Sequence, residues 1–315
     1  MPPHGGGMGG LMDFKQMEAF VNVIKYRSFS KAADASFLTQ PTISTHVNTL
    51  EKELGVLLVD RQPKEALPTK QGQIFYEYAL NMLHTREQAT FALNTFSQKV
   101  GGILEIQTSS IPGQYLLPKL MREFQKQYEN VRYYLEQSDS SIVIENIKAQ
   151  KGEIGFTGMK NDDGMTYTPL MQDKVVLLTP KNQKFENLTG KRLNIKDFIG
   201  EGFVWREQGS GTRLAFENHI KHLGYDPKSM NIIARMNSME AIKQAVSYGL
   251  GVSIVSEISI PENIENETYM AFPIEEFQVS REFYLVCNHK VSMSPTAEIF
   301  KNFTLDYFQF RRMEG

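Results

Sequence analysis

Two segments of the chain combine hydroxyl, glycine and arginine residues in a way that suits anion binding. One is residues 108–113, Thr-Ser-Ser-Ile-Pro-Gly, and the other is residues 206–213, Arg-Glu-Gln-Gly-Ser-Gly-Thr-Arg. Glycine lets backbone N–H groups turn toward a ligand, hydroxyl groups add neutral donors, and the start of a helix adds partial positive charge. Arg206 or Arg213 would supply a full charge. These residue types predict a site for a small anion, such as a carboxylate or an oxyanion.

Other residues join this predicted ligand site from the ends of neighbouring strands. Thr157-Gly158 ends one expected strand, and Ser238 precedes a helix that it can cap. Two roles stay open for Ser238: it only caps this helix, or its side chain also reaches the cleft. A purely structural alternative stays open, in which Ser210 and Thr212 only cap a helix and Arg213 pairs with an acidic side chain. The candidate ligand-binding residues are Ser109, Ser110, Ile111, Thr157, Gly158, Arg206, Ser210, Gly211, Thr212 and Ser238.

A second group of short polar side chains lies near the N-terminus, in a helix expected over residues 41–54. On an ideal helix Pro41, Thr45 and Asn48 lie opposite the apolar face. Short hydroxyl and amide side chains let a helix approach base edges in the major groove, and nearby cations would contact phosphates. The alternative is a small helical bundle that packs against another element. The candidate DNA-contacting residues are Ser30, Gln40, Pro41, Thr42, Ser44, Thr45, Asn48, Arg61 and Lys64.

Catalytic and metal-binding patterns are weak in this sequence. His219 and His222 are three residues apart on an expected helix, but no third metal ligand follows from the pattern. Ser109 and Ser210 have no His and Asp partners at telling positions, and Cys287 lies in an apolar strand as a small hydrophobic residue. We therefore expect no enzymatic activity, no catalytic residue, no metal, and no cofactor apart from a small effector.

Helices must position the polar group near the N-terminus. Regular spacing of apolar residues predicts the first helix, Ser30 can cap the second, and Pro41 suits the first turn of the third. Gly55 suits the end of that third helix. Together these elements predict an all-α winged helix-turn-helix. The expected elements are helices at 13–27, after Ser30 and at 41–54, and two wing strands at 57–61 and 66–69.

One long helix is expected over residues 71–98, because this stretch contains no proline and, after Gly72, no glycine. Apolar and small residues recur seven apart, which is typical of a seam between two helices. Since paired helix-turn-helix modules read half-sites about one DNA turn apart, we expect this helix to join two copies of the chain. The alternative is a helix that lies on its own domain. The residues expected at the dimer seam are Phe75, Tyr78, Met82, Ala89 and Phe96.

From Ile103 onward, strand-like and helix-like segments alternate, which is typical of an α/β fold with parallel sheets. This part is longer than one such unit, so we expect two subdomains, with the chain crossing near Pro180 and returning near Gln278. Ligands in such folds bind at the carboxyl ends of strands. The expected parts are a flexible tail or cloning remnant at 1–11, a DNA-binding domain at 12–70, a linker helix at 71–100, a hinge at Gly101-Gly102, and an effector-binding domain at 101–315 with subdomain I at about 103–179 and 279–315 and subdomain II at about 180–278.

Composition narrows the class of protein. The 315 residues are 41% hydrophobic and carry a net charge of -2, which fits folded domains and excludes a protein that binds nucleic acid through bulk charge. A single cysteine allows neither an intramolecular disulfide nor a cysteine-rich metal site. The sequence shows no apolar run long enough to span a membrane and no secretory signal. We therefore expect a cytoplasmic protein without a membrane partner.

The region from Phe20 to Gly72 resembles the winged helix-turn-helix of LysR-type transcriptional regulators. His46 and Leu58 stand where that family more often has Gln and Phe, a difference that affects packing or base preference. The matching residues are Phe20, Ser28, Phe29, Ala32, Ala33, Leu38, Gln40, Pro41, Ser44, Leu50, Glu51, Leu54, Gly55, Leu57, Arg61, Thr69 and Gly72.

The resemblance implies a periplasmic-binding-protein-like fold for the C-terminal domain and dimerisation through the linker helix. It also implies that Gln40, Pro41, Thr42, Ser44 and Thr45 read bases or line the groove, and that Arg61 contacts the DNA backbone. Expected partners are double-stranded operator DNA, a small effector, further copies in a homodimer or homotetramer, and RNA polymerase. The segment 206–213 resembles the anion-binding segment of a subgroup in which some members respond to sulfur-containing anions.

The sequence thus predicts a LysR-type regulator whose DNA binding is modulated by a small ligand in the C-terminal cleft. Two other classes stay open. A solute-binding transport protein would share the sensing fold but would need export and would not need residues 13–98, and an anion-handling enzyme would need a catalytic base in the cleft. Binding to promoter fragments would discriminate against both.

Overall fold

A computed structural model of the chain describes residues 12–62, 65–93, 100–261, 263–264, 268–276 and 281–314. The chain divides into two compact units, Met1–Gln98 with Lys290–Pro295, and Lys99–His289 with Thr296–Gly315. The expected tail at 1–11, the DNA-contact candidate Lys64 and the seam candidate Phe96 lie outside the described residues. No helix of the described part is long and apolar enough to cross a membrane.

The first unit is the expected winged helix-turn-helix. Its third helix begins after Thr39, whose hydroxyl accepts from the N–H of Thr42, and ends at Gly55 with a left-handed φ of 69°. Ser28, rather than Ser30, caps the second helix, because that helix already begins at Phe29. The elements are α1 (Phe14–Tyr26), α2 (Phe29–Ala35), α3 (Gln40–Leu54), the antiparallel wing of β1 (Val59–Arg61) and β2 (Ala66–Pro68), and α4 (Lys70–Leu93).

Helix α4 packs on the core of its own unit along the first half of its length. Tyr76, Ala79 and Leu83 are buried there, and Phe75 and Met82 are partly buried against the same core. Phe75 and Met82 therefore also help to cover α1, as the alternative of a helix lying on its own domain expects, and the dimer seam stays a prediction. The residues that stay exposed on α4 include Ile74, Tyr78, Thr85, Ala89 and Leu93.

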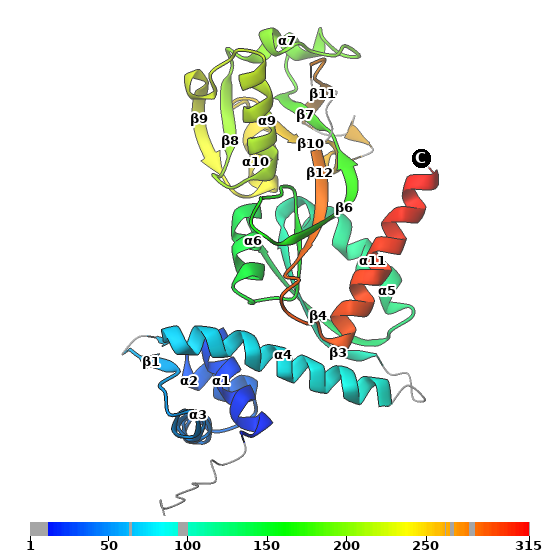
Figure 1. Cartoon of the computed structure of the whole chain (residues 1–315). Coiled ribbons are helices and arrows are strands. Elements are labelled where there is room, and N and C mark those ends of the chain that lie inside the picture. The colour runs from blue at the N-terminus through cyan, green and yellow to red at the C-terminus, as the bar shows by residue number, and fades with distance from the viewer. Residues whose placement is uncertain are drawn as a thin grey trace, which may run out of the picture. The chain divides into compact units, whose positions relative to one another are not determined.

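Subdomain I of the second unit is built on a five-stranded sheet of order β4-β3-β5-β12-β6. Strands β4, β3 and β5 are parallel, whereas β12 runs antiparallel to β5 and β6. Helices α5 and α11 lie side by side (Figure 1), with the rings of Phe124 and Phe300 4.9 Å apart. The elements are β3 (Gly101–Ser109), a π-helical turn (Pro112–Leu116), α5 (Leu117–Gln125), β4 (Asn130–Ser138), α6 (Ser140–Lys148), β5 (Ile154–Thr157), β6 (Thr166–Asp173), β12 (Arg281–Cys287) and α11 (Pro295–Glu314).

Subdomain II contains a three-stranded sheet of order β10-β7-β11 and a parallel pair of β8 and β9. A bridge between Phe203 and Val252 connects the two. Rings of Phe203, Trp205 and Phe216 pack edge to face in its core. The elements are β7 (Val175–Pro180), α7 (Gln183–Glu186), α8 (Ile195–Phe198), β8 (Gly202–Arg206), α9 (Gly211–His222), β9 (Asn231–Met236), α10 (Met239–Ser247), β10 (Ser253–Ser256) and β11 (Tyr269–Pro273), with short 3-10 turns at Pro227–Ser229 and Glu257–Ser259.

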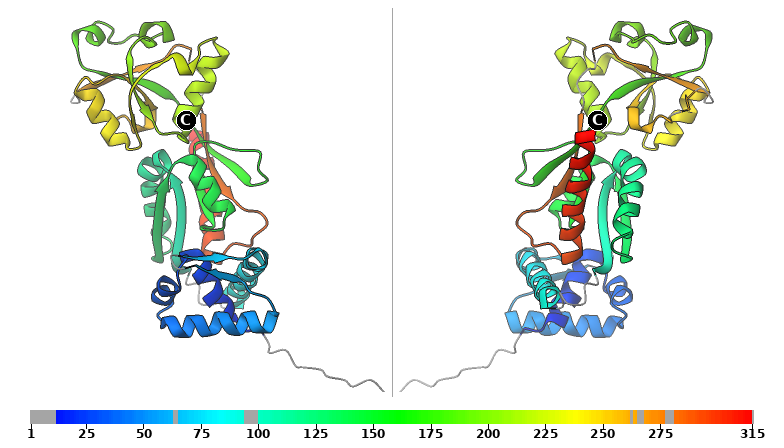
Figure 2. Two further views of the ribbon diagram at one scale, coloured as in Figure 1. Left: turned by 90° about the vertical axis from the view of Figure 1, so that its left-hand side faces the viewer. Right: turned by 90° about the vertical axis from the view of Figure 1, so that its right-hand side faces the viewer.

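The structure corrects three details of the expected C-terminal organisation. The chain first crosses between the subdomains after Asp173, because β7 pairs with β10 and β11 in subdomain II; it returns between β11 and β12 (Figure 2). The five-stranded sheet of subdomain I contains antiparallel pairs, and the three-stranded sheet of subdomain II is entirely antiparallel, so neither is the parallel sheet that the pattern predicts. Gly101 and Gly102 begin strand β3 and form no separate hinge. The strands β6 and β11 and the helices α7 and α8 were not predicted from the sequence.

Candidate functional site

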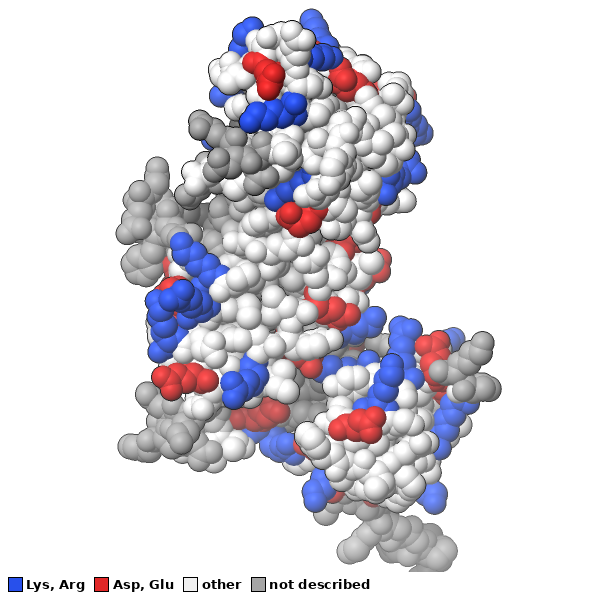
Figure 3. Space-filling view, turned by 180° about the vertical axis from the view of Figure 1, so that it is seen from behind, with Lys and Arg blue, Asp and Glu red and all other residues white. Residues whose placement is uncertain are grey.

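The N-terminal unit presents the polar face of α3 as predicted. Gln40, Pro41 and Thr45 are exposed, and Thr42, Ser44 and Asn48 are half-buried, while Ile43, Val47 and Leu50 on the other face enter the core. The exposed Ser30 of α2 donates to Oε1 of Gln40 at 3.0 Å, which brings α2 to the start of α3. On the surface drawn in Figure 3, cationic and anionic side chains are interspersed. Because the exposed candidates of α3, Gln40, Pro41 and Thr45, are uncharged, a DNA contact there depends on a few positioned groups and on helix geometry.

A buried carboxylate, missed in the sequence analysis as a functional group, fixes the wing against α3. Oε1 of Glu51 accepts from the N–H groups of Leu58 and Val59 at 2.8 and 3.0 Å. Oε2 of Glu51 lies 3.3 Å from Nη2 of Arg61, which also donates to Asn48. Glu51 thereby holds the exposed Arg61 beside the polar face of α3, where a phosphate contact would need a cation. In the sequence, Glu51 stands out only as a position that matches the family pattern.

The second unit brings both predicted anion loops to one small cavity between its subdomains. Eight of the ten ligand candidates line it, and the five lining residues that were not predicted come from both subdomains. The free volume is about 10 Å³, which is room for about one water molecule. The predicted lining residues are Ser109, Ser110, Ile111, Gly158, Arg206, Ser210, Gly211 and Thr212, and the others are Asp139, Ser140, Glu207, Arg281 and Phe283.

Two buried arginines dominate the electrostatics of this cavity. The side chains of Arg206 and Arg281 are 3% and 7% exposed. Nη1 of Arg206 and Nη2 of Arg281 are buried and have no hydrogen-bond partner among the described residues. Burial lowers the pKa of Arg281, the neighbouring Asp173 opposes this effect, and the charge of Arg206 adds to it. Such donors favour an anion, because unsatisfied buried donors are costly.

Arg281 is held at the two chain crossings between the subdomains. Its Nε donates to Oδ2 of Asp173 at 2.7 Å, and Oδ1 of Asp173 accepts from the hydroxyl of Ser256 at 2.7 Å. Asp173 ends β6, Arg281 begins β12 and Ser256 ends β10. A ligand on Arg281 would therefore touch a group that is bonded directly to the connecting strands.

Glycines allow the two sides of the cavity to approach closely. A Cβ on Gly211 would lie 2.8 Å from the carbonyl oxygen of Gly158, across the subdomain boundary. Gly209 has a left-handed φ of 100°, and a Cβ there would lie 2.6 Å from Oδ1 of Asp139. The glycines of the segment 206–213 are thus needed for contact between subdomains in this closed arrangement.

A second polar contact, outside the cavity lining, joins the two subdomains. Nζ of Lys243 in α10 lies 3.2 Å from the phenol oxygen of Tyr115 and 3.0 Å from Oε1 of Glu240. Burial raises the pKa of Tyr115, although Lys243 opposes this effect. The pKa of Lys243 is raised: burial lowers it, but the contacts with Glu240 and Tyr115 outweigh that effect. No sequence signal pointed to this contact, since its members lie far apart in the chain.

Three predicted or considered residues lie away from the cavity lining. Thr157 is buried and its hydroxyl accepts from the N–H of Met159. Ser238 is exposed and caps α10 by accepting from Ala241, so its short side chain serves the helix end. Arg213 pairs with Glu217 at 2.7 Å, and Arg206 therefore supplies the charge in this segment. Arg281 was missed because it begins a strand far from both loops in the sequence.

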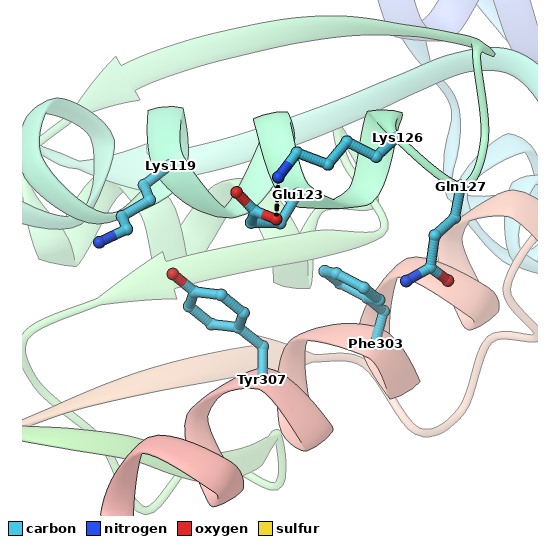
Figure 4. A pocket seen from close by; sticks show the side chains of 6 residues that line it. All are labelled: Lys119, Glu123, Lys126, Gln127, Phe303 and Tyr307. Atoms are coloured by element: carbon cyan, nitrogen blue, oxygen red, sulfur yellow. Dashed lines mark hydrogen bonds and ion pairs between the residues drawn. The ribbon is translucent and has the colours of Figure 1, made fainter. Parts of the chain in front are cut away.

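Two other cavities are larger and lined mainly by surface side chains. One, of about 360 Å³, lies between α5 and α11 and is lined by Lys119, Glu123, Lys126, Gln127, Phe303 and Tyr307 (Figure 4). The hydrogen bond from Lys126 lowers the pKa of Glu123. The other, of about 560 Å³, lies along β11 with Lys181, Lys191 and Arg192 at its rim, and Arg192 pairs with Glu275 at 2.8 Å.

Metal binding and thiol chemistry would each need His, Cys, Asp or Glu side chains in particular surroundings. Among the described residues, no three His, Cys, Asp or Glu side chains are arranged to hold a metal ion. Cys287 is buried at the end of β12, and burial raises the pKa of its thiol. A raised thiol pKa leaves little thiolate at neutral pH, which disfavours a nucleophilic role.

Comparison with known proteins identifies the family. Residues 14–73 match the family model described as bacterial regulatory helix-turn-helix protein, lysR family, and residues 97–309 match the LysR substrate binding domain. An uncharacterized HTH-type transcriptional regulator, MJ0300, of Methanocaldococcus jannaschii is 33% identical over 270 residues, covering 85% of this chain and 90% of that protein.

Solved structures share the fold of the chain. A point variant of full-length OxyR from Pseudomonas aeruginosa superposes with a TM-score of 0.74 at 17% identity, covering 95% of each chain. The CcmR regulatory domain of Synechocystis PCC6803, solved in complex with 2-PG, superposes with a TM-score of 0.59 at 22% identity over 66% of this chain and 98% of that one. With its DNA-binding unit, its two-subdomain sensing unit and both family models matched, the chain belongs to the LysR family of transcriptional regulators.

Proposed function

We propose that the effector of this LysR-type regulator is a small anion bound between Arg206 and Arg281. The observation that carries the proposal is that both guanidinium groups are buried, line one cavity and each keep a nitrogen without an acceptor among the described residues. Ser110, Ser210 and Thr212 line the same cavity. The hydroxyls of Ser110 and Ser210 accept from Nη2 of Arg206 and from the N–H of Arg213, and each hydroxyl can still donate its proton to a ligand. The complex of the CcmR domain with 2-PG supports a small-molecule ligand in this fold.

Ligand binding would act by changing the relation between the subdomains. The closed cavity has a free volume of only about 10 Å³, so an anion larger than water requires the Gly211–Gly158 contact or a lining side chain to move. A ligand shifts such an equilibrium only by the difference in its affinity for the two arrangements. Because Arg281 is bonded to Asp173 at the chain crossing, its occupancy is coupled to that movement.

The effector proposal is tested by calorimetric titration of the full chain with inorganic sulfate and phosphate. Arg206→Gln and Arg281→Gln should each weaken binding at least tenfold, about 1.4 kcal/mol. Arg192→Gln is the matched control, since Arg192 pairs with Glu275 at 2.8 Å and neither residue lines the cavity; it should leave the affinity within about twofold of wild type. Equal affinity in all four proteins would place the anion site elsewhere.

For DNA, we propose that the exposed face of α3 enters the major groove while Arg61 contacts a phosphate. The exposure of Gln40, Pro41 and Thr45 and the fixed position of Arg61 support this assignment. In a gel shift with promoter fragments, Thr45→Ala should weaken the preferred fragment selectively. Arg61→Ala should weaken all fragments and reduce the salt dependence of binding. Unchanged affinity in both variants would contradict the assignment.

We further propose that the chain works in the cytoplasm as a homodimer or homotetramer, contacts RNA polymerase and catalyses no reaction. Dimerisation would use the exposed row of Ile74, Tyr78 and Ala89 on α4, because two modules are needed to read two half-sites. The RNA polymerase contact rests on the family resemblance. Light scattering of wild type and Tyr78→Glu tests the α4 seam: the variant should lose the dimer, and an unchanged mass would refute this seam.

A further inference from the structure

The anion cavity already holds a carboxylate from the chain itself. Nε of Arg206 donates to Oε2 of Glu207 at 2.8 Å, and Nη2 donates to Oε1 at 2.8 Å. This two-bond fork is the arrangement in which a guanidinium group binds a free carboxylate or oxyanion. Glu207 is itself a lining residue of the cavity, so its carboxylate occupies donors that a ligand would use.

The two partners differ in how easily they can move. Arg206 is 3% exposed, and its Nη2 also donates to the hydroxyl of Ser110 at 2.9 Å in the other subdomain. Glu207 is 22% exposed. Among the described residues, its carboxylate accepts side-chain hydrogen bonds from Arg206. The carboxylate of Glu207 can therefore turn toward solvent, whereas the guanidinium of Arg206 stays in the cavity.

Charge balance also requires Glu207 to leave when an anion binds. In the closed cavity Glu207 compensates Arg206, and Asp173 compensates Arg281. Asp139, a further lining residue, contributes another carboxylate. An added anion would bring excess negative charge into a water-poor site unless one carboxylate withdraws, and like charges in such a site repel strongly. Asp173 is fully buried, and Asp139 caps α6 by accepting from the N–H of Ile142, so Glu207 is the carboxylate that can withdraw.

We propose that Glu207 is a tethered internal ligand of Arg206, which the effector displaces, and that this competition selects doubly charged oxyanions. The proposal rests on the anion site described above. A monocarboxylate would only replace the Glu207 carboxylate charge for charge, against a competitor held at high effective concentration. A dianion brings more charge than Glu207 and has oxygens for the free nitrogens of both Arg206 and Arg281.

Isothermal titration of the full chain with sulfate and with acetate, at constant ionic strength, tests this competition. Wild type should bind sulfate at least tenfold more tightly than acetate. Glu207→Gln should bind sulfate at least tenfold more tightly than wild type, because the isosteric amide cannot form the charged fork. Glu275→Gln is the matched control: Glu275 pairs with Arg192 at 2.8 Å and does not line the cavity, so its loss should change the affinity for sulfate less than twofold.

The outcomes separate the two proposals. Sulfate binding that needs Arg206 but is equal or weaker in Glu207→Gln would overturn the internal ligand and leave the anion site intact. Equal wild-type affinities for sulfate and acetate would overturn the selection of dianions. If neither wild type nor Glu207→Gln binds any of these anions, both proposals fail. Urea unfolding followed by the single tryptophan, Trp205, confirms that each variant is folded.

Discussion

Replacing Asp173 by asparagine tests how far the buried ion pair at the chain crossings stabilises the effector-binding unit. Asp173 is fully buried, Arg281 is 7% exposed, and Nε and Oδ2 are 2.7 Å apart. In Asp173→Asn the shape is kept, but the charge that compensates Arg281 is lost. The Arg281 guanidinium then remains buried beside Arg206, whose charge already disfavours it.

Removing one partner of a buried ion pair typically costs about 3–5 kcal/mol. We expect a loss of about 3 kcal/mol in the free energy of unfolding, the lower end of that range, because the amide oxygen can still accept from Ser256 or Arg281. With a urea m-value of about 2–3 kcal/mol per molar, the unfolding midpoint should fall by about 1 M. Trp205 lies in the core of subdomain II, so its fluorescence follows this unit alone.

The exposed Asp162 provides the matched control. Asp162→Asn should change the free energy of unfolding by no more than about 0.5 kcal/mol. Added sulfate should stabilise Asp173→Asn more than Asp162→Asn, since an anion near Arg281 replaces part of the missing charge; the control accounts for the general stabilisation of proteins by sulfate. If Asp173→Asn were as stable as Asp162→Asn, the assigned role of the buried pair would be refuted.

Two further predictions concern packing and pH. A Cβ on Gly72 would lie 1.9 Å from the carbonyl oxygen of Leu58. Gly72→Ala should therefore destabilise the DNA-binding unit by about 1–3 kcal/mol, measured by circular dichroism, and weaken operator binding in gel shifts. Gly200→Ala, with open space around the added Cβ, should change neither quantity. Burial raises the pKa of Tyr133 from 10.0 to about 12, so stability that is complete below about pH 10 should be lost as the pH rises toward 12. Urea midpoints of Tyr133→Phe should fall less steeply over this range, and identical slopes would contradict the assignment.

Local signals in the sequence predicted most of the DNA-binding unit. Pro41 lies in the first turn of α3 and Gly55 ends it, as predicted, because such signals act within one turn of the chain. The cap of α2 was placed two residues late, at Ser30 instead of Ser28. The apolar spacing that predicted which face of α3 is buried is equally local. What could not be read was the role of Glu51, because its contacts with Leu58 and Val59 need the wing to fold back onto α3.

The same division applies to the proposed anion site. Residue types alone predicted the loops at 108–113 and 206–213 as ligand-binding, since glycine and hydroxyl residues before a helix can bind an anion whatever the rest of the fold. Arg281 became part of the site only through the return of the chain from β11 to β12, and Asp173 only through the early crossing before β7. These placements depend on strand pairing between distant segments, which no local pattern encodes.

The sequence by itself determined the third helix of the first unit, with its exposed polar face, and the two loops predicted to hold an anion, because caps, periodicity and glycine-rich turns act over a few residues. The family followed from the resemblance of Phe20 to Gly72 to LysR-type regulators, which the family models confirm. Tertiary structure alone decided that two buried guanidinium groups share one cavity and that Glu207 lies on one of them. The physical reason is that burial, charge pairing and unsatisfied donors are properties of the packed chain, created when residues far apart in sequence exclude water together.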